Sequence, residues 1–155
     1  MNQRKLLIID DEQAVHEMLS QYLRELGFMT YSAFDGREGL KTLEDHPGIN
    51  IVLTDVRIPG MDGLAVLREI KRRDPARQVI LMTAFSNKNM AIQALRLGAD
   101  EYLEKPLHLD ELTEILERSL RRRRLQSLST RWQEFLEHLP IGFFWCTAEG
   151  LIEGA

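Results

Sequence analysis

Cysteine is almost absent from this 155-residue sequence, whose only one is Cys146. A single thiol excludes an internal disulfide and is typical of a protein in a reducing compartment. Long apolar runs are absent too. The first run, residues 6–9, stops at an acidic cluster, and no run reaches the roughly 18 residues of a membrane span. We therefore expect a cytoplasmic protein with neither a membrane helix nor a secretory leader.

Excess positive charge is also missing. The formal net charge is −4, which gives no support for a general nucleic-acid-binding protein. The basic run Arg121–Arg124 could contact nucleic acid, but no helix-turn-helix pattern follows it, so we interpret it as a solvated helix surface. With 44% hydrophobic and 28% charged residues, the composition is globular, and the length suits one domain with an appendage.

Five short apolar runs alternate with segments in which apolar residues recur at helical spacing; the runs are residues 5–9, 28–32, 50–54, 78–82 and 100–104. The first, third and fourth are continuously apolar, as expected of parallel strands covered on both faces. The alternation predicts an α/β fold: a flavodoxin-like, doubly wound, five-stranded parallel sheet in the order 2-1-3-4-5. A helix that begins near Leu109 meets no proline or glycine before Pro140, which predicts an extended C-terminal helix.

Polar side chains follow four of the predicted strands. Asp10 and Asp11 end the first strand, Asp55 the third and Thr83 the fourth, while Lys105 follows the fifth. The carboxyl ends of parallel strands meet at one edge of a sheet, so we expect these side chains to converge there. Taken alone, the adjacent aspartates could be an ordinary solvated helix N-terminus. The presence of Asp55, Thr83 and Lys105 at the same edge favours a functional site instead.

The expected site has a definite chemistry. Three carboxylates and one ammonium leave a net negative charge, which favours a bound cation, and carboxylate oxygens suit Mg²⁺ next to a phosphate. Asp55 could attack a phosphorus atom without a general base, because a carboxylate carries no proton at neutral pH. Mg²⁺ on Asp10 and Asp11, together with Lys105, would balance the phosphoryl charge, and Thr83 could donate a hydrogen bond.

Residues 4 to about 120 resemble the receiver domain of bacterial two-component response regulators. The resemblance rests on four stretches in the right order and spacing, "IIDDE", "LTDVRIPGMDG", "ILMTAF" and "GADEYLEKP". It implies that Asp55 accepts a phosphoryl group from a sensor histidine kinase. It also implies a Mg²⁺ site made by Asp10, Asp11, Asp55 and the backbone carbonyl of Arg57.

The same resemblance implies a switch. Lys105 would contact the phosphoryl group, and the Lys105–Pro106 bond is typically cis in the family. Thr83 would be drawn towards the phosphoryl group, and Tyr102 would turn into the space that it leaves. The face formed by the fourth helix, the fifth strand (100–104) and the fifth helix would change shape.

Two positions near the site bear on the lifetime of the phosphorylated state. Arg57 lies two residues after Asp55, and Phe85 lies two residues after Thr83. Neither is an acid or amide suited to orienting a hydrolytic water, and Phe85 could shield the acyl phosphate. We predict slow self-dephosphorylation.

A second apolar stripe lies beyond residue 120, at intervals of 3, 4, 3 and 4, and consists of Leu125, Leu128, Trp132, Phe135 and Leu139. This spacing is typical of a coiled-coil seam and predicts a parallel homodimer that also uses the face of the fourth helix, fifth strand and fifth helix. The alternative is an amphipathic helix that packs on its own following domain. We predict a receiver domain at 1–122, a helical, coiled-coil-like linker at 123–139 and a tail at 140–155.

The tail is the most aromatic part of the chain. The stretch "EFLEHLPIGFFWCTAEGLIEGA" resembles the opening of a PAS sensor domain, with a first hairpin around "EGLIEGA", and it ends soon after the hairpin. We therefore expect a fragment of a longer protein. The alternative is an aromatic tail that folds back on the helix.

The leading hypothesis is a phosphorylation-dependent switch that assists its own phosphorylation and dephosphorylation but is not an enzyme. The first rival is a Mg²⁺-dependent phosphohydrolase with an aspartyl-phosphate intermediate; such enzymes usually carry a second aspartate where this chain has Arg57, and they need a substrate cap. A phosphate-independent scaffold is the second rival. The histidines (His16, His46, His108 and His138) show no metal-ligand spacing and receive no role.

Overall fold

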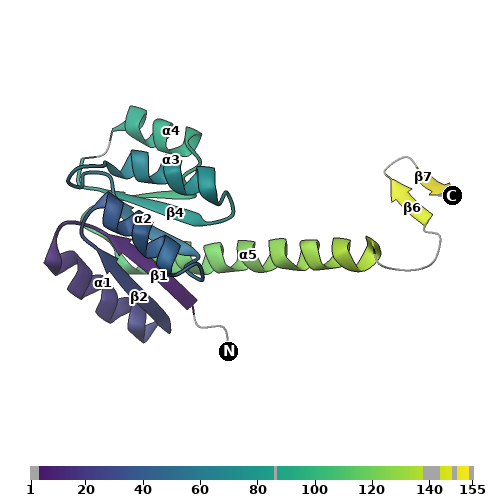
Figure 1. The fold of residues 1–155 in the computed structure, drawn as a ribbon, viewed down its shortest axis with the longest axis horizontal. Helices are drawn as coiled ribbons and strands as arrows, with labels where there is room; N and C mark the ends of the chain where they lie inside the picture. The colour runs from purple at the N-terminus through teal and green to yellow at the C-terminus, as the bar shows by residue number, and fades with distance from the viewer. Residues whose placement is uncertain (1–3, 86, 138–143, 148–149, 154–155) are drawn as a thin grey trace. The chain divides into compact units, whose positions relative to one another are not determined.

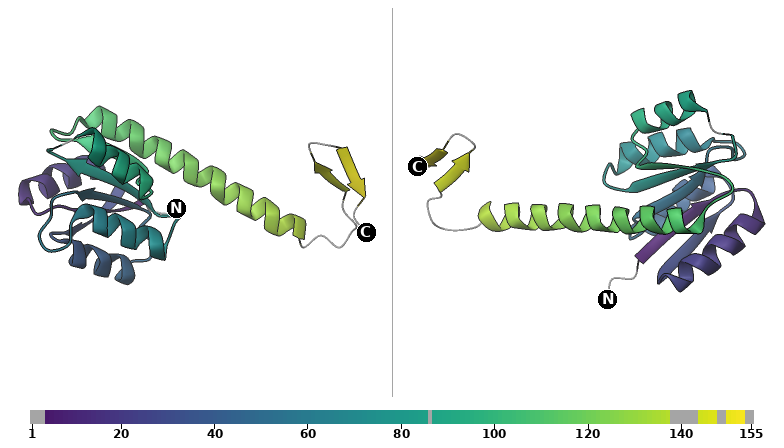
Figure 2. Two further views of the ribbon diagram at one scale, coloured as in Figure 1. Left: turned by 90° about the horizontal axis from the view of Figure 1, so that it is seen from above. Right: turned by 180° about the vertical axis from the view of Figure 1, so that it is seen from behind.

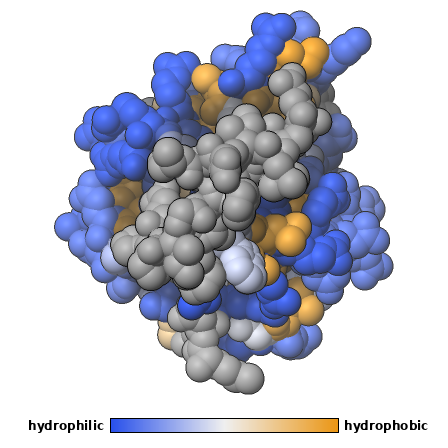
Figure 3. Space-filling view, turned by 90° about the vertical axis from the view of Figure 1, so that its right-hand side faces the viewer, coloured by the Kyte–Doolittle hydropathy of each residue, from blue (hydrophilic) through white to orange (hydrophobic). Residues whose placement is uncertain are grey.

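A computed structural model describes residues 4–85, 87–137, 144–147 and 150–153 (Figure 1). The chain divides into two compact units, Met1–Ile115 and Leu116–Ala155. The predicted domain limits at residues 122 and 139 stay predictions. Within the described ranges, no helix combines the length and the apolar character that crossing a bilayer requires. In Figure 3, the surface around the atoms drawn in grey is mainly hydrophilic, with apolar side chains in small separate patches.

The first unit contains the predicted parallel sheet. Its order is β2-β1-β3-β4-β5, which confirms the sequence-based order. The strands are β1 (Arg4–Ile9), β2 (Phe28–Ala33), β3 (Ile51–Asp55), β4 (Gln78–Thr83) and β5 (Glu101–Glu104). The register pairs Ile9 with Thr54 and Thr83 with Glu104, so the carboxyl ends of β1, β3, β4 and β5 lie at one edge.

Helices cover both faces of this sheet (Figure 2). They are α1 (Gln13–Glu25), α2 (Gly36–Asp45), α3 (Gly63–Arg73), α4 (Lys88–Arg96) and the first turns of α5, a helix that runs from Leu109 to Glu137. Residues of α2, α3 and α4 share one apolar cluster with the strands. On the other face, α1 and the first turns of α5 are joined by the Tyr22 hydroxyl, which donates to the Leu109 carbonyl at 3.2 Å and also contacts the Thr113 hydroxyl.

The helix ends follow from local sequence. Asp35, Asp62 and Asn87 precede α2, α3 and α4, and each side chain accepts a backbone N–H three residues later. Gly27 and Gly98 follow the ends of α1 and α4 with φ of 87° and 96°, a left-handed conformation that glycine adopts without steric cost. These glycines are the stops that end a helical pattern in the sequence.

The second unit contains the remainder of α5 and an antiparallel pair of strands. β6 (Phe144–Thr147) pairs with β7 (Gly150–Glu153). The predicted long C-terminal helix is confirmed as far as Glu137. Leu139, the last residue of the predicted seam, and Pro140 lie outside the described residues. The strand pair is the part of the aromatic tail that the structure describes.

The close approach of Gly63, the first residue of α3, to the backbone at the end of β3 can be tested by substitution. A Cβ at Gly63 would overlap the carbonyl oxygen of Asp55 and lie 2.8 Å from the Cα of Val56. We expect Gly63→Ala to lower the free energy of unfolding by about 2 kcal/mol, because backbone cannot move aside as a side chain can. In Gly48→Ala, the new Cβ meets only the flexible Lys5 side chain at 3.5 Å. Urea denaturation that finds equal losses for the two variants would contradict this account.

Candidate functional site

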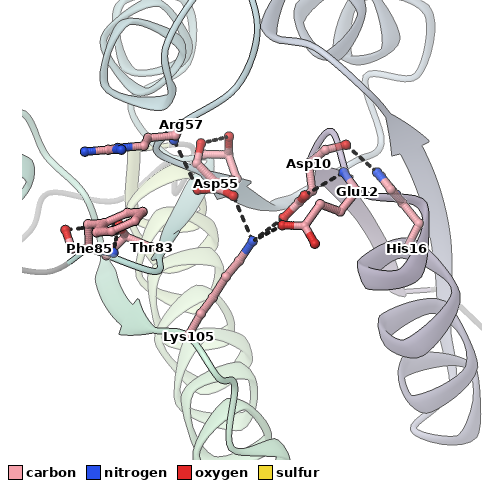
Figure 4. Close-up of polar contacts among 9 residues, drawn as sticks. Asp10, Glu12, His16, Asp55, Arg57, Thr83, Phe85 and Lys105 are labelled. Atoms are coloured by element: carbon pink, nitrogen blue, oxygen red, sulfur yellow. Dashed lines mark hydrogen bonds and ion pairs between the residues drawn. The ribbon is translucent and has the colours of Figure 1, made fainter.

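The carboxyl ends of β1, β3 and β5 bring three charged side chains into contact (Figure 4). The Lys105 Nζ donates to Asp10 Oδ2 at 2.7 Å and to Asp55 Oδ2 at 2.7 Å. Asp10 is fully buried, and Asp55 is 7% exposed. Neither carboxylate can be well solvated, so the ammonium is their main neutralising partner.

The acidic cluster is larger than the sequence analysis expected. One carboxylate oxygen from each of Asp10, Asp11, Glu12 and Asp55 lies within 4.8 Å of the others. Glu12 was not predicted, although it directly follows the aspartate pair in the same acidic run. Its Oε1 lies 3.9 Å from Lys105 Nζ. Four carboxylates against one ammonium leave three formal negative charges at this edge.

The donor set fits a hard divalent cation. All four side chains offer oxygen, and Asp11 and Glu12 are exposed, so water can complete the coordination. Mg²⁺ binds through one or two carboxylates, keeps several waters and pairs with phosphate oxygens. A site that is buried on the Asp10 side and open on the Asp11 side matches that preference.

The pKa of Lys105 reflects two opposing effects. Burial is the largest single effect and would lower the pKa, but the hydrogen bonds to Asp10 and Asp55 and the negative charges of these two carboxylates together outweigh it and raise the pKa. The ammonium therefore stays charged throughout the physiological range. The Lys105 backbone N–H donates to the Thr83 carbonyl at 2.7 Å, and the Lys105–Pro106 bond is cis, as the family resemblance implied.

Asp55 is held on both carboxylate oxygens. Its Oδ1 accepts the Arg57 backbone N–H at 3.1 Å, and its Oδ2 faces Lys105. The predicted metal contact of the Arg57 carbonyl stays a prediction. The Arg57 guanidinium lies over the ring of Phe85, 4.2 Å from its centre, in a cation–π contact, and Phe85 is 60% exposed. This stacked pair lies beside Asp55, on the side away from Asp10 (Figure 4).

The two predicted switch residues lie on neighbouring strands. The Thr83 hydroxyl accepts the Phe85 N–H at 3.1 Å and lies 3.3 Å from the Phe85 carbonyl oxygen. The Tyr102 hydroxyl is buried and has no hydrogen bond of ordinary geometry in the described structure. Burial raises the pKa of Tyr102, Thr83 lies close enough to oppose this rise, and Glu104 adds to it. The side chain of Tyr102 is thus already turned inward, towards Thr83.

His16 is a residue of this site that the sequence analysis missed. It is 3% exposed, and its Nε2 lies 2.7 Å from the carbonyl oxygen of Asp10. The spacing of possible metal ligands in the sequence does not indicate a role for His16. Its position in the helical pattern does indicate burial, because His16, Leu19 and Leu23 fall at intervals of three and four residues and are the buried residues of α1.

Comparisons with known proteins find relatives of this chain. A family model described as "Response regulator receiver domain" matches residues 6–117. Regulatory protein AtoC of Escherichia coli (strain K12) is 41% identical over 138 residues, 83% of this chain and 30% of AtoC. DNA-binding transcriptional regulator NtrC of the same strain is 37% identical over 113 residues, 73% of this chain and 24% of NtrC. The chain thus spans less than a third of these relatives.

Solved structures show the same fold. A response regulator receiver domain protein from Clostridium thermocellum is 32% identical, with a TM-score of 0.76 over 79% of this chain and 98% of that one. The receiver domain of NtrX from Brucella abortus is 33% identical, with a TM-score of 0.70 over 75% of this chain and 98% of that one.

The bridging role of Lys105 can be measured as stability. We expect Lys105→Met to lower the free energy of unfolding, in the absence of divalent cations, by about 3 kcal/mol, because it leaves two buried carboxylates without their counter-ion. Lys41→Met is the matched control, since Lys41 is exposed and its ion pair with Asp45 is 4.0 Å long. We expect that control to change stability by less than about 0.5 kcal/mol. Equal effects in urea denaturation would show that Lys105 does not neutralise the pair.

Proposed function

The chain belongs to the response regulator receiver domain family, and from this premise we propose that it is a phosphorylation-dependent signalling switch of the cytoplasm. Asp55 accepts a phosphoryl group from a sensor histidine kinase, with Mg²⁺ at the acidic cluster. The observation that carries the proposal is the Lys105 ammonium, which is bonded at 2.7 Å to both Asp10 and Asp55. The ammonium supplies a positive charge beside the carboxylate at the end of β3, the central strand of the sheet.

The proposed transfer needs little covalent chemistry from the protein. A carboxylate oxygen of Asp55 forms a bond to phosphorus while the bond between phosphorus and the donor's histidine nitrogen breaks, and the imidazole leaves. Asp10, Asp11 and Asp55 would hold Mg²⁺, which would supply positive charge near the phosphoryl oxygens. Lys105 lies within reach of the same oxygens. The Arg57 N–H orients the Asp55 carboxylate during the attack.

In the proposed switch, the new phosphoryl group competes with the backbone of Phe85 for the Thr83 hydroxyl. Thr83 gives up its contacts with Phe85 and donates to a phosphoryl oxygen. Tyr102, whose hydroxyl is already buried, then turns further into the space that Thr83 leaves. The consequence is a change of the α4, β5 and α5 face. Ile92 and Leu95 on α4 are exposed by 38% and 57%, which supports this face as a surface that contacts a partner.

We further propose that the signal passes through a dimeric helix to a downstream domain. On α5, Leu125, Leu128 and Trp132 are exposed by 68%, 46% and 62%, at the spacing of a coiled-coil seam. A second copy of the chain would cover them in parallel. The antiparallel pair β6–β7 supports the interpretation of the tail as the start of a PAS-like domain, since the pair has the form of a first hairpin.

The first test measures intact-protein mass after incubation with a small phosphodonor and Mg²⁺. We expect the gain of one phosphoryl group, which is lost in Asp55→Asn and in the absence of Mg²⁺. Steady release of phosphate without an adduct would instead favour a phosphohydrolase. Neither adduct nor release would leave a phosphate-independent scaffold.

The second test concerns the lifetime of the acyl phosphate. Phe85 stacks with Arg57 beside Asp55 and offers no group that can orient water. We expect Phe85→Glu to shorten the half-life by about tenfold or more, because a carboxylate can orient and polarise the attacking water. Phe85→Leu, which keeps an apolar side chain, is the control and should change the half-life far less. An unchanged half-life in Phe85→Glu would contradict the shielding role.

The third test concerns the seam. We expect sedimentation to detect a dimer that Leu128→Lys weakens by at least about tenfold, because it buries a charge at the centre of the seam. Thr130→Lys changes an exposed position on the opposite side of α5 and should leave the dimer intact. A monomeric wild type, or equal weakening by both variants, would favour a helix that packs on its own following domain.

A further inference from the structure

We infer that His16 is a positioning residue that fixes the peptide between the two metal-binding aspartates. This inference rests on the proposed function, because it assigns His16 a role in binding Mg²⁺. The starting observation is a hydrogen bond in the buried floor of the site: His16 Nε2 lies 2.7 Å from the carbonyl oxygen of Asp10 (Figure 4). A carbonyl oxygen can only accept, so Nε2 carries the proton and donates.

The hydrogen bond from His16 holds the peptide group whose orientation relates the side chains of Asp10 and Asp11. The carbonyl of Asp10 belongs to the peptide that joins Asp10 to Asp11, and rotation of this peptide would swing the Asp11 side chain relative to that of Asp10. The rest of Asp10 is already held, since its N–H donates to the Ala33 carbonyl at 3.1 Å and its Oδ1 accepts the Glu12 N–H at 2.9 Å. His16 adds a side-chain bond to the carbonyl, and all three anchors then act on one residue.

The other ring nitrogen shows that His16 does more than fill space. Nδ1 is buried and has no hydrogen-bond partner among the described residues. Leaving a buried polar atom unpaired costs stability, and an apolar side chain of similar size would avoid that cost. Packing alone therefore does not explain an imidazole at this position, because its Nδ1 is unpaired and only its Nε2 forms a hydrogen bond.

The ring itself is held from a second element. Phe34, which follows β2, packs against His16 with ring centroids 4.4 Å apart and an angle of 41° between the ring planes. The Phe34 N–H donates to Glu38 Oε2 at 2.8 Å, which ties the packing residue to the first turn of α2. The imidazole is thus braced against rotation, and its N–H stays directed at the carbonyl. Partners of this kind set the geometry of metal ligands that they do not replace.

The test compares two side chains of similar length and volume, glutamine and methionine. Gln Nε2 can reach the position of His Nε2 and keep the N–H donor, whereas methionine cannot donate. Calorimetric titration of unphosphorylated protein with Mg²⁺ should give an affinity for His16→Gln within about threefold of wild type and for His16→Met about tenfold weaker. Thermal unfolding in the absence of Mg²⁺ checks that both variants are folded.

Each outcome decides the question. Equal affinity of His16→Met and wild type would overturn the inference, and equal weakening in both variants would show that ring shape matters instead of the N–H. A wild type that binds no Mg²⁺ would overturn the proposed function and this inference with it. If His16→Met does not fold, ¹⁵N spectra of the wild-type imidazoles replace it. A proton on His16 Nε2 is expected in Mg²⁺-free protein, and an unprotonated Nε2 would overturn the inference.

Discussion

The ammonium of Lys105 between two buried carboxylates is the interaction on which the rest of this site depends. Asp10 and Asp55 end the adjacent strands β1 and β3, while Lys105 follows β5, which is separated from β3 by β4. Its side chain must therefore reach past β4, and only a long, flexible cation can do so. The backbone of Lys105 is fixed at its base by the bond to the Thr83 carbonyl. The strand order, the register at the end of β4 and the length of one side chain together place the charge.

That arrangement is a poor way to make a domain stable. A buried ion pair recovers little more than the cost of removing its charges from water, and apolar side chains of similar size would serve stability as well or better. The cluster also keeps more carboxylates than its one ammonium can neutralise. Burial is graded across it, from Asp10 at 0% exposure to the exposed Asp11 and Glu12. This gradient leaves the uncompensated charge on the solvent side, where a hydrated cation can approach without crossing the core.

The regular parts of the fold could be predicted because strong local patterns specify them. Continuous apolar runs marked β1, β3 and β4, and residues at strand ends pointed to Asp55 and Lys105. Contacts between side chains of separate loops could not be predicted. Arg57 and Phe85 are 28 positions apart, and their stacking depends on rotamers that no periodicity encodes. His16 could not be predicted for a different reason. Its hydrogen-bond partner is a backbone carbonyl, which every residue type has, so the sequence does not reveal the contact. Only the position of His16 in the helical pattern indicated that it would be buried.

The proposed switch would start from the contacts that Tyr102 and Thr83 make in this structure. An unpaired buried hydroxyl costs about 1–3 kcal/mol, so the inward position of Tyr102 is held by packing of its ring against that penalty. The Thr83 hydroxyl contacts the backbone of Phe85, with its oxygen 3.1 Å from the Phe85 nitrogen and 3.3 Å from the Phe85 carbonyl oxygen. Two packings of similar free energy are the condition under which a ligand with modest differential affinity shifts the population. In the proposed switch, a phosphoryl group on Asp55 that captured the Thr83 hydroxyl would change what Tyr102 packs against, and bonding that differs between two packings is what shifts their populations.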